Sequence, residues 1–91
     1  MDFIKEDNQI YLKDEKGQIL AEIAFPETAP GEVTIIHTFV DKSLRGQQIA
    51  SKLTEAVCDV ARCQGKKIRP MCTYAAKWFK ENPDMSDVLV K

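Results

Sequence analysis

Length, composition and charge limit what this protein can be. The 91 residues carry a net charge of −1 and are 44% hydrophobic and 30% charged, which suits one globular domain with one core. A dedicated nucleic-acid binder should show a basic excess, and no apolar run reaches the roughly 20 residues of a membrane-spanning helix. We therefore expect neither nucleic acid nor a membrane as a partner.

The cysteines and the first residues indicate a cytoplasmic protein. Cys58, Cys63 and Cys72 are odd in number and lack the spacing of metal ligands, with one histidine in the whole chain to help them. Reduced thiols are the expected state, and no metal site is predicted. The start Met-Asp-Phe-Ile-Lys-Glu-Asp is acidic and mixed, unlike a signal peptide.

The first third of the chain predicts an antiparallel meander. An apolar stretch at residues 3–4 resumes at 9–12 after a turn at Asp7-Asn8, and residues 14–17 form a stronger turn. Residues 18–25 are predicted to be a second long strand, because loops of hairpin length join antiparallel neighbours.

Two prolines and a glycine predict a loop over residues 26–31, and a central strand follows over 32–40. This strand is apolar on both faces, which indicates that it is covered on both sides. His37 alternates with three apolar residues of the strand, so we expect its side chain on a largely apolar face. These residues are Val33, Ile35 and Phe39.

A helix is predicted from the polar loop at Gly46 to Gly65, because apolar residues recur with a 3.6-residue period. Its expected buried face consists of Ile49, Leu53, Ala56, Val57, Val60 and Ala61. The opposite face should carry ion pairs at a spacing of three residues. These pairs are Lys52–Glu55 and Asp59–Arg62.

The last part of the chain predicts a short strand and a second helix. Lys67–Arg69 should pair parallel to the central strand, since a helical crossover separates the two. Thr73 is the expected cap of a helix that Asn82-Pro83 ends, with Ala75, Trp78 and Phe79 facing inward. The stretch from Asp84 to Lys91 is expected to be a tail with a final turn. The element order is β-β-β-α-β-α, an α+β class.

The turn between the central strand and the long helix is a candidate phosphate cradle. Gly46 lets the backbone come close to a ligand, and the start of the helix offers unpaired N–H groups to an anion. Arg45 can add a charge-assisted contact. The alternative interpretation is a loop that only caps a structural helix.

The same residues resemble a known family. Leu44-Arg45-Gly46-Gln47-Gln48-Ile49-Ala50 is similar to the Arg/Gln-x-x-Gly-x-Gly/Ala pyrophosphate loop of the GNAT N-acetyltransferase superfamily, with Gln48 where the family usually has Gly. His37-Thr38, Cys72-Thr73-Tyr74-Ala75 and Trp78…Asn82-Pro83 resemble a short, single-domain branch of it. The likeness covers roughly residues 10–89.

The resemblance implies a shortened GNAT-like fold over residues 1–91 and acetyl-CoA or CoA as cofactor. Full-size members have extra helices between the first two strands, and Asp7-Asn8 leaves no room for them. The acceptor side should therefore be open, or completed by a partner. The cofactor-binding residues that the resemblance implies are Phe39, Val40, Arg45, Gly46, Gln47, Gln48, Ile49, Ala50 and Tyr74.

Three residues are candidates for catalysis. His37 could take the proton of an amine acceptor, because imidazole titrates near neutrality, or it could be a core histidine. Cys72 precedes a helix start that favours its thiolate, so it could accept an acyl group, line the acetyl pocket, or be a small buried hydrophobe. Tyr74 is similar to the tyrosine that many GNAT enzymes place near the departing sulfur as general acid; packing is the alternative. Cys58 and Cys63 are expected to be inert.

These observations favour an acetyltransferase that passes acetyl from acetyl-CoA to an amine whose identity the sequence does not reveal. Direct attack by the amine is the family default, and an acyl-enzyme on Cys72 is the variant. Two alternatives are a non-catalytic acyl-CoA-binding or sensing module and a protein-interaction domain. Lys66, Lys67 and Arg69 are expected to be a solvated cationic end or to touch the cofactor's outer phosphate. We expect a monomer or a weak homodimer.

Overall fold

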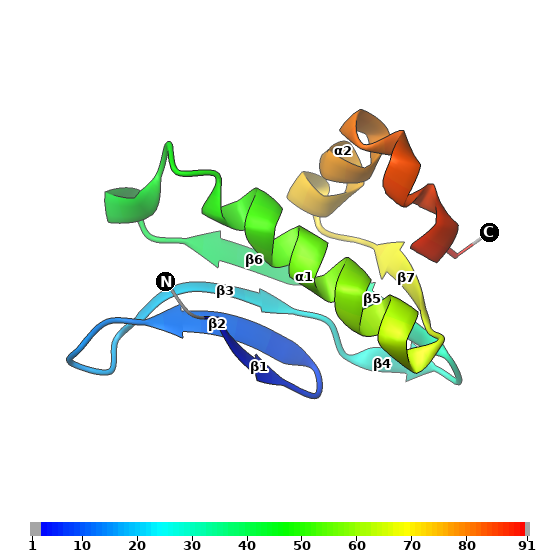
Figure 1. Cartoon of the computed structure of the whole chain (residues 1–91), viewed down its shortest axis with the longest axis horizontal. Coiled ribbons are helices and arrows are strands. Elements are labelled where there is room, and N and C mark those ends of the chain that lie inside the picture. Colours follow the sequence, from blue (N-terminus) through cyan, green and yellow to red (C-terminus); the bar gives the residue numbers. More distant parts are fainter. Residues whose placement is uncertain (1–2, 91) are drawn as a thin grey trace.

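The computed structural model describes residues 3–90, so Met1, Asp2 and Lys91 lie outside the account that follows. Two sheets lie against one long helix (Figure 1). The larger is antiparallel with strand order β1-β2-β3-β6. Its strands are β1 (Ile4–Glu6), β2 (Gln9–Lys13), β3 (Ile19–Ala24) and β6 (His37–Val40). The predicted meander and the α+β class are confirmed.

The smaller sheet has the order β4-β5-β7 and consists of β4 (Glu27–Ala29), β5 (Glu32–Ile35) and β7 (Lys67–Pro70). β7 pairs parallel to β5, as predicted, with Val33 opposite Ile68. The prediction of a loop over residues 26–31 was wrong, because β4 lies within it and pairs antiparallel with β5. Prolines are compatible with an edge strand, and a residue before proline prefers extended backbone.

The central strand is not continuous, and a β-bulge divides it at Ile36. The N–H of Ile36 donates to Ala24 O, while the strand register places His37 opposite the same Ala24. Ile36 and His37 therefore both oppose the single residue Ala24. The extra residue reverses which face of the sheet each later side chain of the strand points to. Val33 and Ile35 are buried, whereas His37 and Phe39 are exposed. The prediction that His37 lies on an apolar face was wrong for this reason.

Helix α1 (Ile49–Gln64) covers one face of the sheets and contributes the centre of the core. Leu53 and Val57 are fully buried against strand residues such as Ile10, Ile23 and Ile35. Thr54 and Cys58 are buried as well, so the buried face is wider than the predicted one, and Val60 lies at its margin. The helix ends at Gly65, whose N–H reaches Ala61 O and Arg62 O, as predicted.

Helix α2 (Thr73–Glu81) packs its buried Ala75, Trp78 and Phe79 inward and ends before Pro83, as predicted. The predicted cap was displaced by one residue: Cys72 is the N-cap and Thr73 is the first helical residue. The Trp78 indole N–H donates to Ser51 Oγ at 2.8 Å. This hydrogen bond ties α2 to the first turn of α1.

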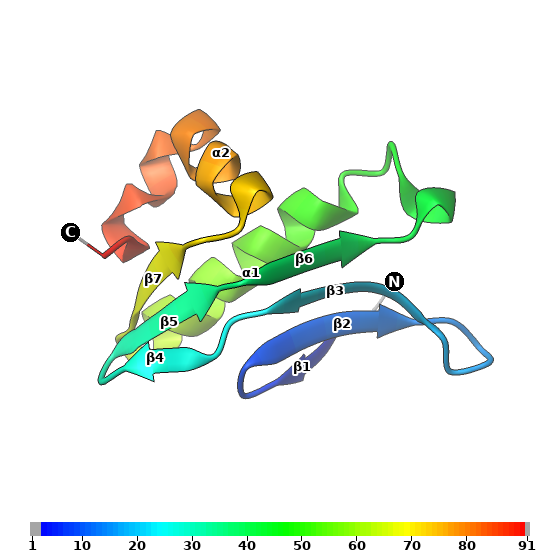
Figure 2. The same ribbon diagram turned by 180° about the vertical axis from the view of Figure 1, so that it is seen from behind.

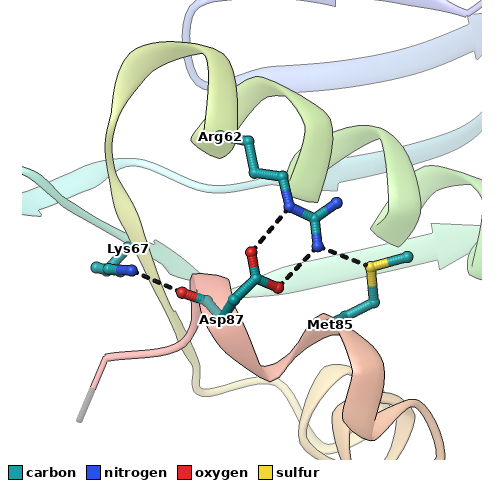
Figure 3. A network of polar contacts seen from close by, with 4 residues as sticks. All are labelled: Arg62, Lys67, Met85 and Asp87. Atoms are coloured by element: carbon teal, nitrogen blue, oxygen red, sulfur yellow. Dashed lines mark hydrogen bonds and ion pairs between the residues drawn. The ribbon is translucent and has the colours of Figure 1, made fainter.

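The predicted tail is ordered as a 3₁₀ segment, η2 (Pro83–Val88), which is fastened to the far end of α1. Arg62 holds Asp87 through two N–H groups, at 3.0 and 2.8 Å, and Lys67 Nζ donates to Asp87 O (Figure 3). The hydrogen bond from Arg62 lowers the pKa of the Asp87 carboxyl. The predicted pair Asp59–Arg62 was therefore wrong: Arg62 turns to an acid 25 residues away. The pair Lys52–Glu55 is likewise not among the ion pairs of the described residues.

The face of the four-stranded sheet opposite α1 is uncovered. Seen from behind, the strands lie in front of α1, and no helix of residues 3–90 crosses them (Figure 2). The exposed apolar side chains Ile4 and Phe39 lie on these strands. No helix in this part of the chain has both the length and the apolarity to cross a membrane.

Candidate active site at the split between β6 and β7

A gap opens where the two sheets separate. The carbonyl of Ile35 accepts the N–H groups of both Met71 and Cys72, at 3.1 and 3.0 Å. Beyond this point the chain from β5 continues into β6 beside β3, whereas the chain from β7 turns away into α2 (Figure 2). The gap therefore lies between β6 and the start of α2.

Strand β6 presents backbone groups to this gap, because it forms one edge of its sheet. Asp41 N–H donates to Leu20 O at 2.7 Å, and the register continues with Phe39 opposite Glu22. Residues that exchange hydrogen bonds alternate with residues that do not in an antiparallel ladder. The N–H and C=O groups of Phe39 therefore point to β3, whereas those of Thr38 and Val40 point to the gap.

A pocket of about 480 Å³ adjoins this edge. It is formed by the end of β6, the loop after it, the first turn of α1 and one residue of α2. The lining residues are Val40, Leu44, Arg45, Gly46, Gln48, Ile49, Ala50, Ser51 and Tyr74. All but two of the predicted cofactor-binding residues line this pocket. The exceptions are Phe39, whose side chain lies on the opposite face of the sheet, and Gln47, whose N–H donates to Leu44 O at 3.3 Å.

The loop is shaped so that the start of α1 faces the pocket. A short 3₁₀ segment, η1 (Lys42–Leu44), is capped by the Asp41 carboxylate, which accepts Ser43 N–H at 2.9 Å. Leu44 anchors the loop in the core, and Gly46 follows with φ of +87°. An added Cβ on Gly46 meets no atom within 4 Å, so it is the backbone angle that selects glycine here.

The pocket is suited to an anion. The N–H groups of the first turn of a helix have no partner within it, and the Gln48 side chain makes no capping hydrogen bond in this structure. The helical ladder begins with Lys52 N–H to Gln48 O. Arg45 is exposed beside these donors, and no Asp or Glu lines the pocket. Both features favour negative charge at the positive end of the helix dipole.

Gln48 adopts the left-handed conformation, with φ 58° and ψ 30°, that favours glycine. We predict that Gln48→Gly raises the free energy of unfolding by up to about 1 kcal/mol, because relief of backbone strain outweighs the added freedom of the unfolded chain. Urea denaturation measures this change. Gln47→Gly is the matched control: Gln47 has no positive φ, so this change should destabilise. Equal effects of the two substitutions contradict the prediction.

Cys72 lies at the inner end of the gap, half-buried between β6 and α2. Its Sγ is 3.7 Å from Thr38 Oγ1. Burial alone raises the pKa of the thiol. Hydrogen bonds to the sulfur have the opposite effect and outweigh burial, so the net pKa is lowered. Their donors are the Ala75 N–H, the Thr38 side chain and the N–H groups of Tyr74 and Thr38. Cys58 differs, because burial raises its pKa to about 11. Cys72 therefore has more thiolate character than Cys58.

Tyr74 lines the pocket from the first turn of α2, two residues after Cys72. Partial burial raises the pKa of its hydroxyl, and the charges of Glu81 and Cys72 act in the same direction. The hydroxyl therefore stays protonated through the neutral range. A protonated phenol at a pocket wall can donate a proton to a leaving group.

His37 lies on the uncovered face of β6, with its side chain 53% exposed. Its Nε2 is 3.3 Å from Glu22 Oε1, and Gln9 Nε2 donates to the other oxygen of Glu22 at 2.7 Å. The structure thus brings His37 near Thr38 and the gap, but on the side of the strand away from the pocket. Sequence reasoning missed Glu22, because its pairing with His37 depends on strand register.

Lys66 and Lys67 lie at the C-terminal end of α1, about 24 Å from the helix start by the usual rise per residue. Lys66 pairs with Glu27, Lys67 binds Asp87 O, and Arg69 pairs with Glu32. The hypothesis that these residues touch a phosphate of a cofactor held at the helix start is therefore replaced by a structural role.

We predict that replacing both Lys66 and Lys67 by alanine changes the affinity for CoA by less than about twofold, since charges beyond a Debye length of roughly 8 Å are screened. Isothermal titration calorimetry with CoA measures the effect. Arg45→Ala provides the comparison at the pocket and should weaken binding more. A larger loss from the lysine pair would place the phosphate site at the wrong end of α1.

A model of a family described as GCN5-related N-acetyltransferase matches residues 9–88, most of the chain. The chain belongs to the GNAT family. Its resemblance to that family, inferred from the loop and the Cys72–Ala75 segment, is thereby confirmed. No match was found among curated proteins.

Solved structures of GNAT proteins share the fold. The solution NMR structure of a GCN5-like protein from Staphylococcus aureus superposes with a TM-score of 0.83 at 30% identity, covering 98% of this chain and 87% of that one. A GNAT-family acetyltransferase from S. aureus MU50 gives 0.64 at 20% identity, covering 82% and 50%. YhbS from Escherichia coli, solved in complex with CoA, gives 0.58 at 23% identity, covering 66% and 37%. The chain thus covers half or less of the length of the MU50 acetyltransferase and of YhbS.

Proposed function

We propose that residues 1–91 form a single GNAT domain that binds acetyl-CoA and transfers its acetyl group to an amine. One observation carries the proposal: a single pocket joins the start of α1, Arg45, Tyr74 and the edge of β6. The family uses acetyl-CoA, and the YhbS structure contains CoA, which supports this choice of ligand.

The pocket residues fit the two ends of CoA differently. The N–H groups from Gly46 to Ala50, with Arg45, would hold the pyrophosphate, since they supply donors and positive potential without an opposing acid. The carbonyl of Thr38 and the peptide groups of Val40 on the open edge of β6 would pair with the amide groups of the pantetheine arm. A near-neutral protein can thus bind an anionic ligand through its backbone.

The residues around the gap can manage the charges of acyl transfer. Bound acetyl-CoA supplies the acetyl group: the amine nitrogen forms a bond to the carbonyl carbon, and the carbon–sulfur bond breaks. A backbone N–H of β6 stabilises the negative oxygen. His37 takes the proton that the amine loses, and Tyr74 gives its proton to the departing sulfur and regains one from solvent. Glu22 Oε1 lies 3.3 Å from His37 Nε2, so we assign the ring proton to Nε2 and the accepting role to Nδ1.

The uncovered sheet face favours a second candidate, a module that binds acyl-CoA without turnover. The chain spans 50% of the S. aureus MU50 protein and 37% of YhbS. Two measurements separate the candidates. Saturating CoA should raise the melting temperature. At a CoA concentration of 100 times the dissociation constant, the free energy of unfolding rises by about 2.7 kcal/mol.

Turnover is then tested with acetyl-CoA and a panel of primary amines, following release of free CoA thiol. Binding with turnover supports the acetyltransferase, and binding without turnover on the whole panel supports the non-catalytic module. If calorimetry detects no CoA binding at all, the protein-interaction alternative takes precedence and the proposal fails.

We predict that Cys72→Ala lowers turnover only a few-fold and leaves CoA binding unchanged, because direct attack by the amine needs no enzyme thiol. The thiol then serves as packing beside the gap. Intact-mass measurement after mixing with acetyl-CoA should find no acetyl group on the protein. Cys63→Ala, an exposed cysteine on α1, is the control and should be fully active. A hydroxylamine-sensitive acetyl group on Cys72, formed and discharged at the rate of turnover, would instead establish a covalent mechanism.

A further inference from the structure

A carboxylate lies in the middle of the uncovered sheet face and is held in a fixed position. One oxygen of Glu22 on β3 accepts a hydrogen bond from Gln9 Nε2 on β2, at 2.7 Å. The other oxygen lies 3.3 Å from His37 Nε2 on β6. Its side chain is 24% exposed, so the contacts restrict it without removing it from solvent. Gln9 and His37 both lie opposite Ala24 in the register, which explains why both reach the same side of Glu22.

Aromatic rings flank this carboxylate. The register places Tyr11 and Phe39 directly opposite Glu22, one on each neighbouring strand, and directly opposite residues share a face of a sheet. Lys13 Nζ lies 5.2 Å from the centre of the Tyr11 ring, so that ring already receives a cation from its own chain. Phe39 is 39% exposed. A carboxylate beside an accessible aromatic ring is a suitable site for an organic cation.

The position of the cluster relates it to the proposed reaction. Phe39 and His37 project from the uncovered face of β6, while the peptide groups of Thr38 and Val40 face the gap. His37 lies on the edge strand β6 itself, and Glu22 on β3 lies one strand away from the edge along which the thioester would lie. A group bound at Glu22 approaches that edge from the side opposite the pocket.

Two exposed apolar residues lie where the gap opens, at the start of β6 and at the end of β7. Ile36, placed on the same side as His37 by the bulge, is 56% exposed, and Met71 is 67% exposed. The two are close in space, because Met71 N–H donates to Ile35 O. Such a surface suits methylene groups next to the cation and disfavours a second charge there.

We propose that Glu22 and Phe39 bind the ammonium group of the acceptor, and that the acceptor is a primary amine on an aliphatic chain. The proposal rests on the acetyltransferase function and names its substrate class. Glu22 first binds the ammonium and keeps His37 oriented. The ammonium releases one proton to solvent and becomes the neutral nucleophile, and His37 takes the second proton as the nitrogen bonds to the acetyl carbon. The same chemistry is offered by the side chain of a lysine and by a free alkylamine.

Amine binding can be measured without turnover and without CoA. The experiment titrates butylammonium into ¹⁵N-labelled protein and follows backbone amide shifts, with 1-butanol as the uncharged comparison. We expect shifts centred on Glu22, His37 and Phe39 with butylammonium only. Glu22→Gln keeps the size of the side chain and removes its charge, so it should weaken butylammonium binding at least about fivefold. Glu55→Gln, an exposed acid on α1, is the control and should change nothing.

The outcomes are separable from those of the proposed function. Calorimetry with CoA should be unchanged in Glu22→Gln, and the KM for the amine should rise more than kcat falls. Equal shifts with butanol, shifts centred elsewhere, or full butylammonium affinity in Glu22→Gln overturns the assignment even if CoA binds and turnover occurs. A second arm titrates N-α-acetyl-lysine amide: tighter binding than butylammonium indicates a peptide acceptor, and equal or weaker binding indicates a free alkylamine.

Discussion

Gly46→Val should reduce the affinity for CoA at least about 100-fold, equivalent to about 2.8 kcal/mol. The wild-type backbone reaches φ of +87° at this position, which a β-branched residue adopts only with strain. The loop would relax toward a negative φ and turn its N–H groups away from the pyrophosphate. Each charge-assisted hydrogen bond contributes roughly 1.5 to 3 kcal/mol, so the loss of two is sufficient. Calorimetry with CoA measures the effect.

Gly17→Val provides a matched control. Gly17 has φ of +85° in the turn between β2 and β3, and an added Cβ there also meets no atom within 4 Å. It does not line the pocket. The two substitutions should therefore cost similar stability in urea denaturation, and only Gly46→Val should weaken CoA. If Gly17→Val weakens CoA equally, the loss reflects general destabilisation and the cradle is not at Gly46.

Much of the fold was predictable because its signals are local. The period of apolar residues places α1, glycine ends it at Gly65, and Asn82-Pro83 ends α2. The candidate phosphate loop was likewise predicted from consecutive residues, Arg45 to Ala50, and most of these residues line one pocket. A short range of sequence determines each of these features, so no knowledge of the register was needed.

The errors share a cause, which is dependence on residues distant in sequence. Arg62 could be expected to pair with Asp59 on its own helix, but η2 brings Asp87 to it. The bulge at Ile36 arises from pairing with Ala24, and it moves His37 from the predicted apolar face to the uncovered one. Simple alternation cannot detect an extra residue. The contact between Glu22 and His37 follows from the same register.

The bulge also has a functional consequence. Without it, His37 and Phe39 would continue the buried row of Val33 and Ile35 under α1. With it, strand β6 carries polar and aromatic groups on one face, and the pocket of about 480 Å³ lies at its end on the other. The proposed division of labour between acceptor and cofactor therefore depends on one additional residue in the strand.

Tyr74→Phe should lower kcat by about 100-fold, the usual contribution of a general acid, while CoA binding changes little. The ring that lines the pocket is kept, and only the hydroxyl is removed. The raised pKa of Tyr74 gives a second observable. A general acid works only while it is protonated. Ionisation of Tyr74 should therefore leave the kcat of the wild-type protein unchanged until the pH exceeds the ordinary tyrosine pKa of about 10.

Lys77→Ala, an exposed residue on the same helix, is the control and should retain full kcat. A Tyr74→Phe variant with kcat near that of Lys77→Ala would show that the sulfur takes its proton from elsewhere. The half-buried Cys72 thiol, held at the same helix start with a lowered pKa, is then the next candidate donor. Combining Tyr74→Phe with Cys72→Ala separates the cases: a shared role gives a double variant much slower than the product of the two single effects predicts.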